Sequence, residues 1–227
     1  MNKKIVIFSA LVVVYCSVFA QNKYRKLSVI DTPEFGKASF ISDSVIIKSS
    51  SKANALSPRS TPEEQLQVLL SVDSLRVYNS LYKDNMGSLT QEELSERKNI
   101  KRDSLYAHIT NKLLFKYQGN DFCVIKYYTK SPGNKKTSSA LIMEKVKDRW
   151  YFTTDSIVDY YSSTFFIFKP KHLSEIFVDH RSQNAILDGL IKEAVVGTRL
   201  DLKTFVRSYL VRLRQNKRDL APLWDSF

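Results

Sequence analysis

The sequence is poor in the residues that catalytic and cofactor sites most often use. Its 227 residues include three histidines, two cysteines and six glycines. No two histidines have the i, i+4 spacing of a helical zinc pair. No glycine-rich phosphate loop and no G-x-S-x-G nucleophile turn occurs. The motifs therefore predict no catalytic, metal-binding or cofactor-binding constellation.

Acidic residues are also scarce compared with basic ones. The chain has 35 lysines and arginines against 23 aspartates and glutamates, which gives a formal net charge of +12. Such an excess favours anionic partners but says nothing about the fold.

The one long apolar run lies at the N-terminus and is too short to span a bilayer. Lys3 and Lys4 precede an apolar stretch, and Val18 and Ala20 take the −3 and −1 positions of a cleavage site before Gln21. Residues 5–20 are fewer than the roughly 20 apolar residues that a membrane-spanning helix needs. This order of charge, apolar core and small residues is typical of a cleavable export signal. We therefore predict a signal peptide over residues 1–20, cleavage after Ala20, and a soluble periplasmic or secreted product with no transmembrane span.

Cys16 offers a competing interpretation, in which the protein is lipid-anchored through this cysteine. The residue before a lipidated cysteine is normally small, but here it is Tyr15. Simple cleavage after Ala20 is therefore preferred.

Cleavage there leaves 207 residues with one cysteine, Cys123, and lowers the net charge to +10, because the leader carries two lysines and no acid. One cysteine cannot form an internal disulfide. Cys123 lies in the apolar segment 122–125, which favours a buried structural role over a reactive one.

The chain divides by pattern into three parts after the signal. Residues 21–60 are expected to form an N-terminal extension and a partly disordered linker, with a short hairpin around Ser42–Ser44. The stretch 49–60 is rich in small polar residues and has no apolar periodicity. Residues 61–169 are expected to form an α+β domain, and residues 170–227 a C-terminal helical extension.

Capping motifs and periodicity predict the elements within these parts. Thr61 and Glu64 form a capping box with Pro62 at the first helical position, and Thr90 and Glu93 form a second. The first of these helices is expected to run to about residue 82, either unbroken or with a break near residues 71–74, and the second is expected to run through residue 113. Strands are expected at 122–130, 138–146, 150–153 and 164–168, followed by helices at 171–178, 182–196 and from 201 onward. Consecutive strands on short turns predict an antiparallel meander, so the fold class is α+β: N-terminal helices packed on a curved sheet, with additional C-terminal helices.

Residues 145–152 carry a charged tight turn followed by a tryptophan that opens a strand. Together with the helices before the meander, this segment resembles the cystatin-like or NTF2-like α+β domains of exported bacterial proteins, over roughly residues 61–169. The resemblance implies a sheet that curls around a helix and leaves a pocket at its mouth. It carries no residue-level function.

The terminal helix is the most informative surface. Its apolar stripe is expected to pack on the domain. Its polar side and the preceding loop carry a set of basic residues that are a candidate surface for an anionic partner: Arg199, Lys203, Arg207, Arg212, Arg214, Lys217 and Arg218. The expected partner is an anionic envelope component or an acidic protein. The export signal disfavours nucleic acid. An ordinary solvated helix face is the alternative.

Three functional hypotheses follow. The leading one is a non-enzymatic module that binds a partner or ligand in the cell envelope. The second is a hydrolase that uses the acidic and aromatic loop 155–161 or the segment from His172 to His180, where Asp179 lies beside His180. The third is a structural or assembly subunit that docks through residues 199–218.

Overall fold

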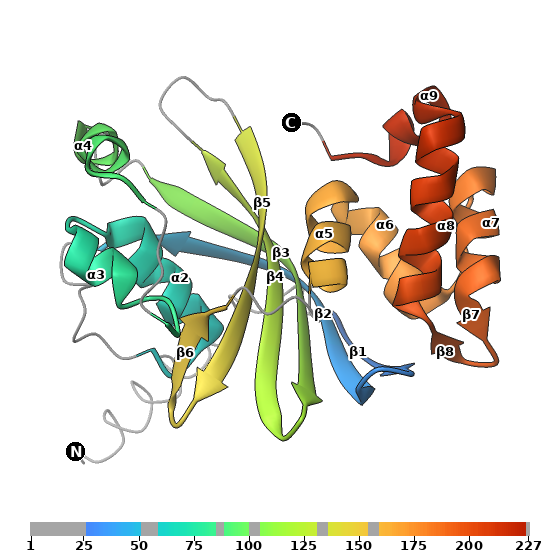
Figure 1. Cartoon of the computed structure of the whole chain (residues 1–227), viewed down its shortest axis with the longest axis horizontal. Helices are drawn as coiled ribbons and strands as arrows, with labels where there is room; N and C mark the ends of the chain where they lie inside the picture. Colours follow the sequence, from blue (N-terminus) through green and yellow to red (C-terminus); the bar gives the residue numbers. More distant parts are fainter. Residues whose placement is uncertain are drawn as a thin grey trace, which may run out of the picture.

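A six-stranded antiparallel sheet forms the centre of the molecule (Figure 1). The computed structural model describes residues 26–50, 59–84, 89–99, 105–130, 136–153 and 159–225. The predicted signal at 1–20 and much of the predicted linker lie outside these residues. The strands follow the chain order, each antiparallel to the one before: β1 (Lys26–Thr32), β2 (Gly36–Lys48), β3 (Tyr106–Tyr117), β4 (Asn120–Lys130), β5 (Lys136–Val146) and β6 (Arg149–Phe152).

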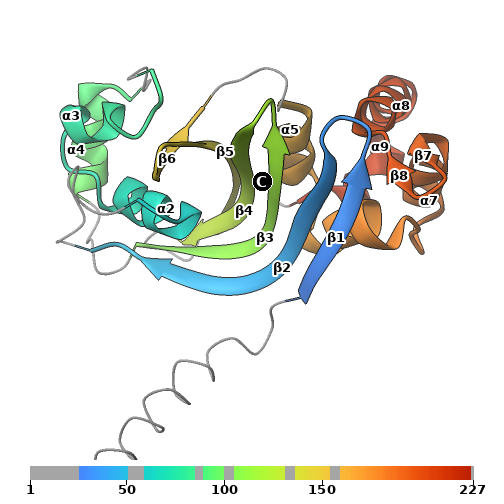
Figure 2. The same ribbon diagram turned by 90° about the horizontal axis from the view of Figure 1, so that it is seen from below.

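Irregularities in register accompany the curvature of this sheet. The pairing of β2 with β3 shifts between Ser42 and Val45, and the pairing of β3 with β4 shifts between Ile109 and Asn111. Extra residues of this kind bend a strand and increase its twist. The sheet curls around the N-terminal helices as a half-open cup (Figure 2).

The concave face of the cup holds α2 (Pro62–Ser71), and α3 (Leu75–Asn79) and α4 (Gln91–Asn99) lie beside it at the rim of the cup (Figure 2). The capping box at Thr61 and Glu64 is confirmed, as is the one at Thr90 and Glu93. These helices and the concave face share one buried apolar cluster, which includes Leu66, Leu81, Ile109, Cys123, Ile125 and Met143.

The convex face is covered by the C-terminal helices. These are α5 (Asp159–Ile167), α6 (Pro170–Ser174), a π-helical turn (Glu175–Asp179), α7 (Ala185–Ala194), α8 (Leu202–Gln215) and α9 (Lys217–Leu220). The small β7–β8 hairpin (Val195–Val196 and Arg199–Leu200) joins α7 to α8, and a 3-10 turn (Ala221–Leu223) follows α9. Asp201 caps α8, at the position where the last helix was expected to begin, because its carboxylate accepts a hydrogen bond from the backbone N–H of Thr204 at 3.0 Å.

The predicted α+β class, with helices on a curved antiparallel sheet and further helices at the C-terminus, is confirmed. No helix among the described residues is long and apolar enough to cross a membrane.

Three local predictions are wrong, each for a physical reason. The helix expected through residue 113 ends at Asn99, and residues 106–117 form β3, where β-branched and aromatic side chains suit a strand with two buried faces. The strand expected at 164–168 belongs to α5 as far as Ile167: Tyr161 and Phe165 lie four residues apart and are both buried, and Phe168 follows the helix in an isolated bridge with Trp224.

The third correction concerns the predicted extension at 21–60. Its residues 26–48 form the first two strands of the sheet. The hairpin turn lies at residues 33–35, whereas Ser42–Ser44 lie within the irregular part of β2. Ile30, Ala38 and Phe40 are buried in the convex-side core, so this segment is part of the fold.

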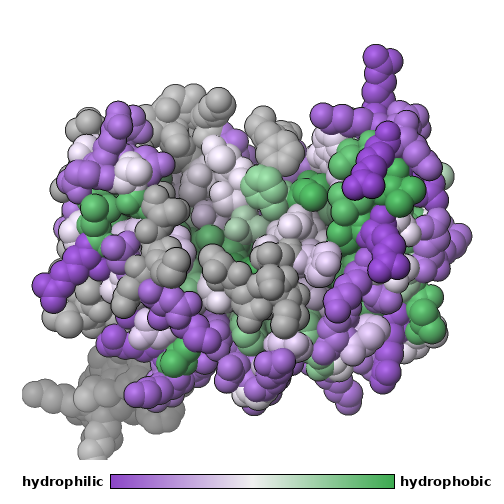
Figure 3. Space-filling view, in the orientation of Figure 1, coloured by the Kyte–Doolittle hydropathy of each residue, from purple (hydrophilic) through white to green (hydrophobic). Residues whose placement is uncertain are grey.

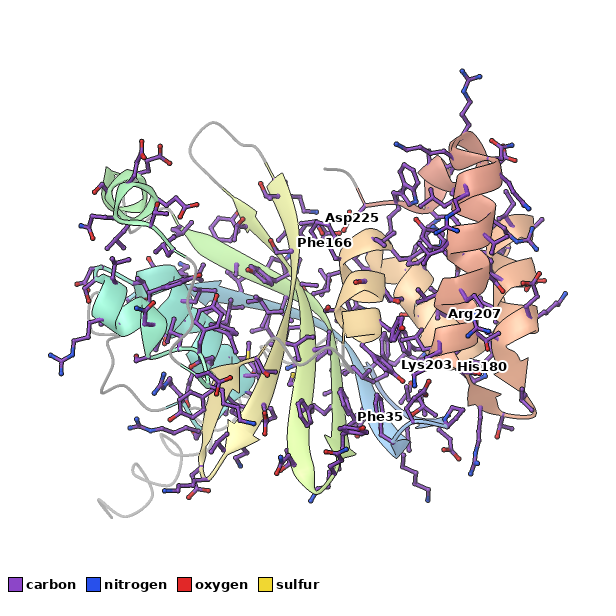
Figure 4. The ribbon with its side chains drawn as sticks, viewed as in Figure 1. Phe35, Phe166, His180, Lys203, Arg207 and Asp225 are labelled. Atoms are coloured by element: carbon purple, nitrogen blue, oxygen red, sulfur yellow. The ribbon has the colours of Figure 1, made fainter. Side chains whose placement is uncertain are left out.

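A buried ion pair fastens the C-terminus to the sheet. The side chain of Lys126 on β4 is fully buried, and its Nζ lies 2.7 Å from Oδ2 of Asp225. Tyr128 and Ser138 donate hydrogen bonds to the same oxygen at 2.6 and 2.9 Å. Phe166 and Asp225 lie side by side at the end of α5 (Figure 4).

This cluster, which we call the C-terminal clasp (Lys126, Tyr128, Ser138 and Asp225), also completes the end of α5. The last carbonyl groups of a helix have no partner within it. Lys126 donates to the carbonyls of Phe165 and Phe166, and the backbone N–H of Asp225 donates to that of Ile167 at 2.8 Å. The clasp therefore joins the sheet, α5 and the chain end in one network.

We expect Asp225→Asn to lower the free energy of unfolding by about 3 kcal/mol, because Lys126 then stays buried without a counter-charge. Chemical denaturation in urea measures this loss. The double variant Lys126→Met/Asp225→Asn should recover part of it, since no unpaired charge remains. Equal losses in the two variants would contradict a role for the ion pair.

The clasp also predicts a pH dependence. Burial alone would raise the pKa of Asp225, but hydrogen bonds from Lys126, Tyr128 and Ser138 outweigh burial and hold this pKa below its ordinary value. The carboxylate therefore stabilises the fold fully above the unfolded-state pKa of about 3.9, and this contribution is lost as the pH falls below it. Urea denaturation midpoints of the wild type should therefore approach those of Asp225→Asn as the pH falls through the lowered pKa of the folded state.

Candidate functional site

The mouth of the cup is an open groove of about 460 Å³. Residues of both edge strands line it, Val29 from β1 and Trp150 from β6, because the curl brings the two edges of the sheet toward one hollow. The remaining lining residues are Lys37, Ala38, Ser39, Leu114, Phe115, Lys116, Asp121 and Phe122. We call this feature the mouth groove.

Strand alternation decides which of these residues present side chains to the mouth groove. Successive side chains of a strand point to opposite faces of the sheet. Ala38, Phe115 and Phe122 belong to the convex-side core, so they contribute backbone. Val29 pairs with Ser39 in the register, and Leu114 packs against the concave-side cluster. The groove thus has an apolar floor and wall formed by Val29, Leu114 and Trp150.

Trp150 is held in place by the segment that leads into α2. Its indole Nε1 donates a hydrogen bond to the carbonyl of Ser60 at 3.1 Å, and its backbone N–H donates one to the carbonyl of Arg59 at 2.9 Å. Its side chain is buried, whereas Val29 keeps 67% of its surface exposed. Trp150 therefore forms a fixed wall of the groove, whereas the aliphatic side chain of Val29 on the other side is exposed to water.

The charges around the mouth groove are mainly positive. Lys37 and Lys116 are exposed, and Lys116 lies 3.6 Å from Asp121 in a loose surface ion pair. Deeper in the cup, Lys112 pairs with Glu63 in the first turn of α2. Two lysines against one aspartate leave the groove with an excess positive charge.

The predicted anionic-partner surface is divided by the structure. Lys203, Arg207 and Arg214 are exposed on α8, and Lys217 and Arg218 are exposed on α9. Arg212 instead donates to Glu193 on α7 at 2.7 Å, and Arg199 donates to Asp31 on β1 at 3.1 Å. These two arginines are engaged in ion pairs with neighbouring elements, so they differ from the exposed row.

The histidine segment of the hydrolase hypothesis forms a packed turn. Nδ1 of His172 lies 2.7 Å from Oε2 of Glu175, and Ser182 donates to the same oxygen at 2.7 Å. His172 is buried at 4% exposure. These contacts tie α6 to the loop before α7. Neither His172 nor His180 lines the mouth groove.

His180 ends the π-helical turn in a left-handed conformation, with φ of 50°. Burial lowers its pKa, which the carbonyl of Phe177 and the charge of Asp179 partly oppose.

The acidic and aromatic loop 155–161 is described only at its end. Residues 155–158 lie outside the described residues, and α5 begins at Asp159. Tyr160 is partly exposed, while Tyr161 is buried and donates to Glu34 at 3.1 Å. The described ranges contain no cluster of three His, Cys, Asp or Glu side chains arranged to hold a metal ion.

The mouth groove was missed by residue-level sequence reasoning, although the resemblance predicted a pocket at the mouth of a curled sheet. Val29 and Lys37 lie in residues 21–60, which were predicted to form an extension, so no strand was predicted at either position. The alternation of Lys112, Leu114 and Lys116 along one strand was the signal that could have revealed them.

The chain matches no protein-family model, no curated protein and no solved structure. The similarity to cystatin-like and NTF2-like domains therefore stays a prediction.

We expect Cys123 to be inert toward thiol reagents in the native protein. It is fully buried, and burial raises the pKa of its thiol. A chromogenic disulfide reagent should label it only when urea unfolds the chain. Rapid labelling of Cys123 in buffer, located by peptide mapping to separate it from Cys16 of unprocessed chains, would contradict this packing.

Proposed function

We propose that this chain is an exported, non-enzymatic binding module of the cell envelope, and that it holds a small amphipathic anion in the mouth groove. The single observation that carries the proposal is this groove, with an apolar wall and exposed lysines at its rim.

The size of the groove supports a small ligand. Ligand sites are typically clefts of about 300–1,000 Å³ that are mostly apolar and carry a few polar groups to orient the ligand. At about 460 Å³ the mouth groove falls within this range. Its lining residues lie on paired strands, so the site is largely formed before a ligand arrives.

The chemistry of the lining supports an anion with an apolar tail. An aliphatic chain laid along Val29, Leu114 and Trp150 would remove apolar surface from water, which is favourable by about 25 cal/mol per Å². A carboxylate or phosphate at the rim would lie near Lys37 and Lys116. A purely polar anion would gain nothing from the apolar wall.

The predicted signal at residues 1–20 supports the proposed location. An exported module of this kind would meet lipid-derived anions and detached acyl chains in the envelope.

Dodecanoate binding tests the proposed ligand class. Trp150 and Trp224 are the two tryptophans of the chain, so in the Trp224→Phe background fluorescence reports on the groove alone. We expect dodecanoate to change Trp150 emission saturably, and dodecanol to bind more weakly because it lacks the charge.

Charge reversal tests the rim. Lys37→Glu/Lys116→Glu should weaken dodecanoate binding about tenfold or more. The matched control is Lys171→Glu/Arg181→Glu, which changes the net charge equally at exposed sites outside the groove lining. Equal weakening in both variants, or no saturable signal in the wild type, would refute the proposed site.

Export is tested separately. Protein purified from its native host should begin at Gln21, as read by intact mass, because peptidase cleavage follows Ala20. Cytosolic material that retains Met1 would refute the location without bearing on the groove.

A further inference from the structure

The exposed row of α8 is an independent surface at the end of the molecule opposite to the N-terminal helices (Figure 1). Lys203, Arg207, Leu210 and Arg214 follow one another at intervals of four, three and four residues. This spacing places them on one face of the helix. The row extends over about 16 Å at about 1.5 Å per residue.

The cations of this row take no part in the ion pairs found among the described residues, unlike Arg212, which pairs with Glu193. Burial alone would raise the pKa of Asp201, the N-cap of the helix, but hydrogen bonds from Thr204, assisted by the backbone and the charge of Lys203, hold this pKa below its ordinary value. Lys203 and Arg207 lie along the same part of α8 (Figure 4). Arg207 and Arg214 are exposed.

Two aliphatic side chains are exposed beside the cations. Leu210 keeps 44% of its surface in water and Val211 keeps 47%. The buried face of α8 is formed by other residues, Leu202, Phe205 and Tyr209. Leu210 and Val211 therefore are not needed to pack the helix on the domain. Apolar surface lies among strongly hydrophilic residues over α8 in the space-filling view (Figure 3).

We propose that α8 docks on an anionic lipid membrane surface through Lys203, Arg207, Leu210, Val211 and Arg214. Helices that lie in a membrane interface combine lysine and arginine with aliphatic residues that enter the boundary between headgroups and acyl chains. The long stems of lysine and arginine allow their charges to reach the headgroups while the aliphatic residues lie deeper.

The shape and charge of the row favour a membrane over an acidic protein. A helix on the outside of a domain is convex, and a flat array of headgroups can contact the whole row at once. An acidic segment would satisfy the cations but would leave Leu210 and Val211 without apolar partners. The exposed cations of α9, Lys217 and Arg218, extend the positive surface beyond the end of α8.

The test is a vesicle flotation assay with protein purified from its native host. The vesicles contain two parts phosphatidylcholine to one part phosphatidylglycerol. We expect the protein to float with these vesicles and to stay behind with vesicles of phosphatidylcholine alone. The triple variant Lys203→Gln/Arg207→Gln/Arg214→Gln should lower the partition coefficient on the order of 100-fold.

A matched control removes equal charge elsewhere. Arg76, Lys147 and Arg149 are exposed on α3 and at the β5–β6 turn. Their replacement by glutamine should lower partitioning far less, because they lie away from α8 (Figure 1). Circular dichroism should show both triple variants folded. An equal loss in the two would mean that net charge alone drives binding, and would overturn the proposal.

The aliphatic residues have their own readout. In Leu210→Trp the added indole should shift its emission to the blue on phosphatidylglycerol vesicles, and Leu210→Ser/Val211→Ser should make binding more sensitive to salt. Flotation without a blue shift would reduce the surface to a charge contact and overturn the docking mode.

Two further results would also refute the proposal. In the first, the wild type does not float with phosphatidylglycerol vesicles. In the second, it binds polyglutamate but not vesicles, which would assign the face to an acidic protein. The groove variant Lys37→Glu/Lys116→Glu, tested in parallel, separates this surface from the mouth groove.

Discussion

The need to cover both faces of one sheet governs this structure. Phe40, Leu113 and Val124 point to the convex side, whereas Ile109, Cys123 and Met143 point to the concave side. A sheet that is apolar on both faces is stable in water only as the middle layer between two others. The N-terminal helices form one outer layer and the C-terminal helices form the other. The C-terminal helices are therefore required by the sheet, and they complete its convex core.

The mouth groove results from incomplete cover of the concave face. The cup extends past the beginning of α2, so part of β1, β2 and β3 has no helix over it. Val29 and Leu114 are left at this uncovered end, while Trp150 is fixed by Ser60. Lysines at the same end keep the open mouth hydrophilic. The length of α2 relative to the curled sheet thus accounts for the position of the groove.

Local signals in the sequence were sufficient where a few neighbouring residues decide the structure. Thr61 with Glu64 and Thr90 with Glu93 were predicted as capping boxes, because a cap depends on residues three apart. The meander over β4, β5 and β6 followed from strand patterns separated by turns. By contrast, residues 164–167 have strand-like composition, and their helical state depends on the packing of Phe165 against the sheet.

Local sequence patterns could not predict which residues far apart in the chain lie together in the fold. Nothing near Lys126 indicates that it is fully buried, since its partner is Asp225 near the end of the chain. In the same way, Val29 and Trp150 meet in one groove only because the whole sheet curls. The individual cations of α8 were identified from sequence, but the division between the exposed row and the paired Arg212 depends on the position of α7.

The C-terminal clasp has a consequence for the order in which the parts of the fold can close. The ammonium group of Lys126 occupies the middle of the sheet, yet its counter-charge lies 225 − 126 = 99 residues further along the chain. Until Asp225 is in place, an ammonium without its partner opposes closure of α5 over the strands. The closed arrangement of α5 on the sheet therefore reaches its full stability only after the segment that carries Asp225 has packed against both of them.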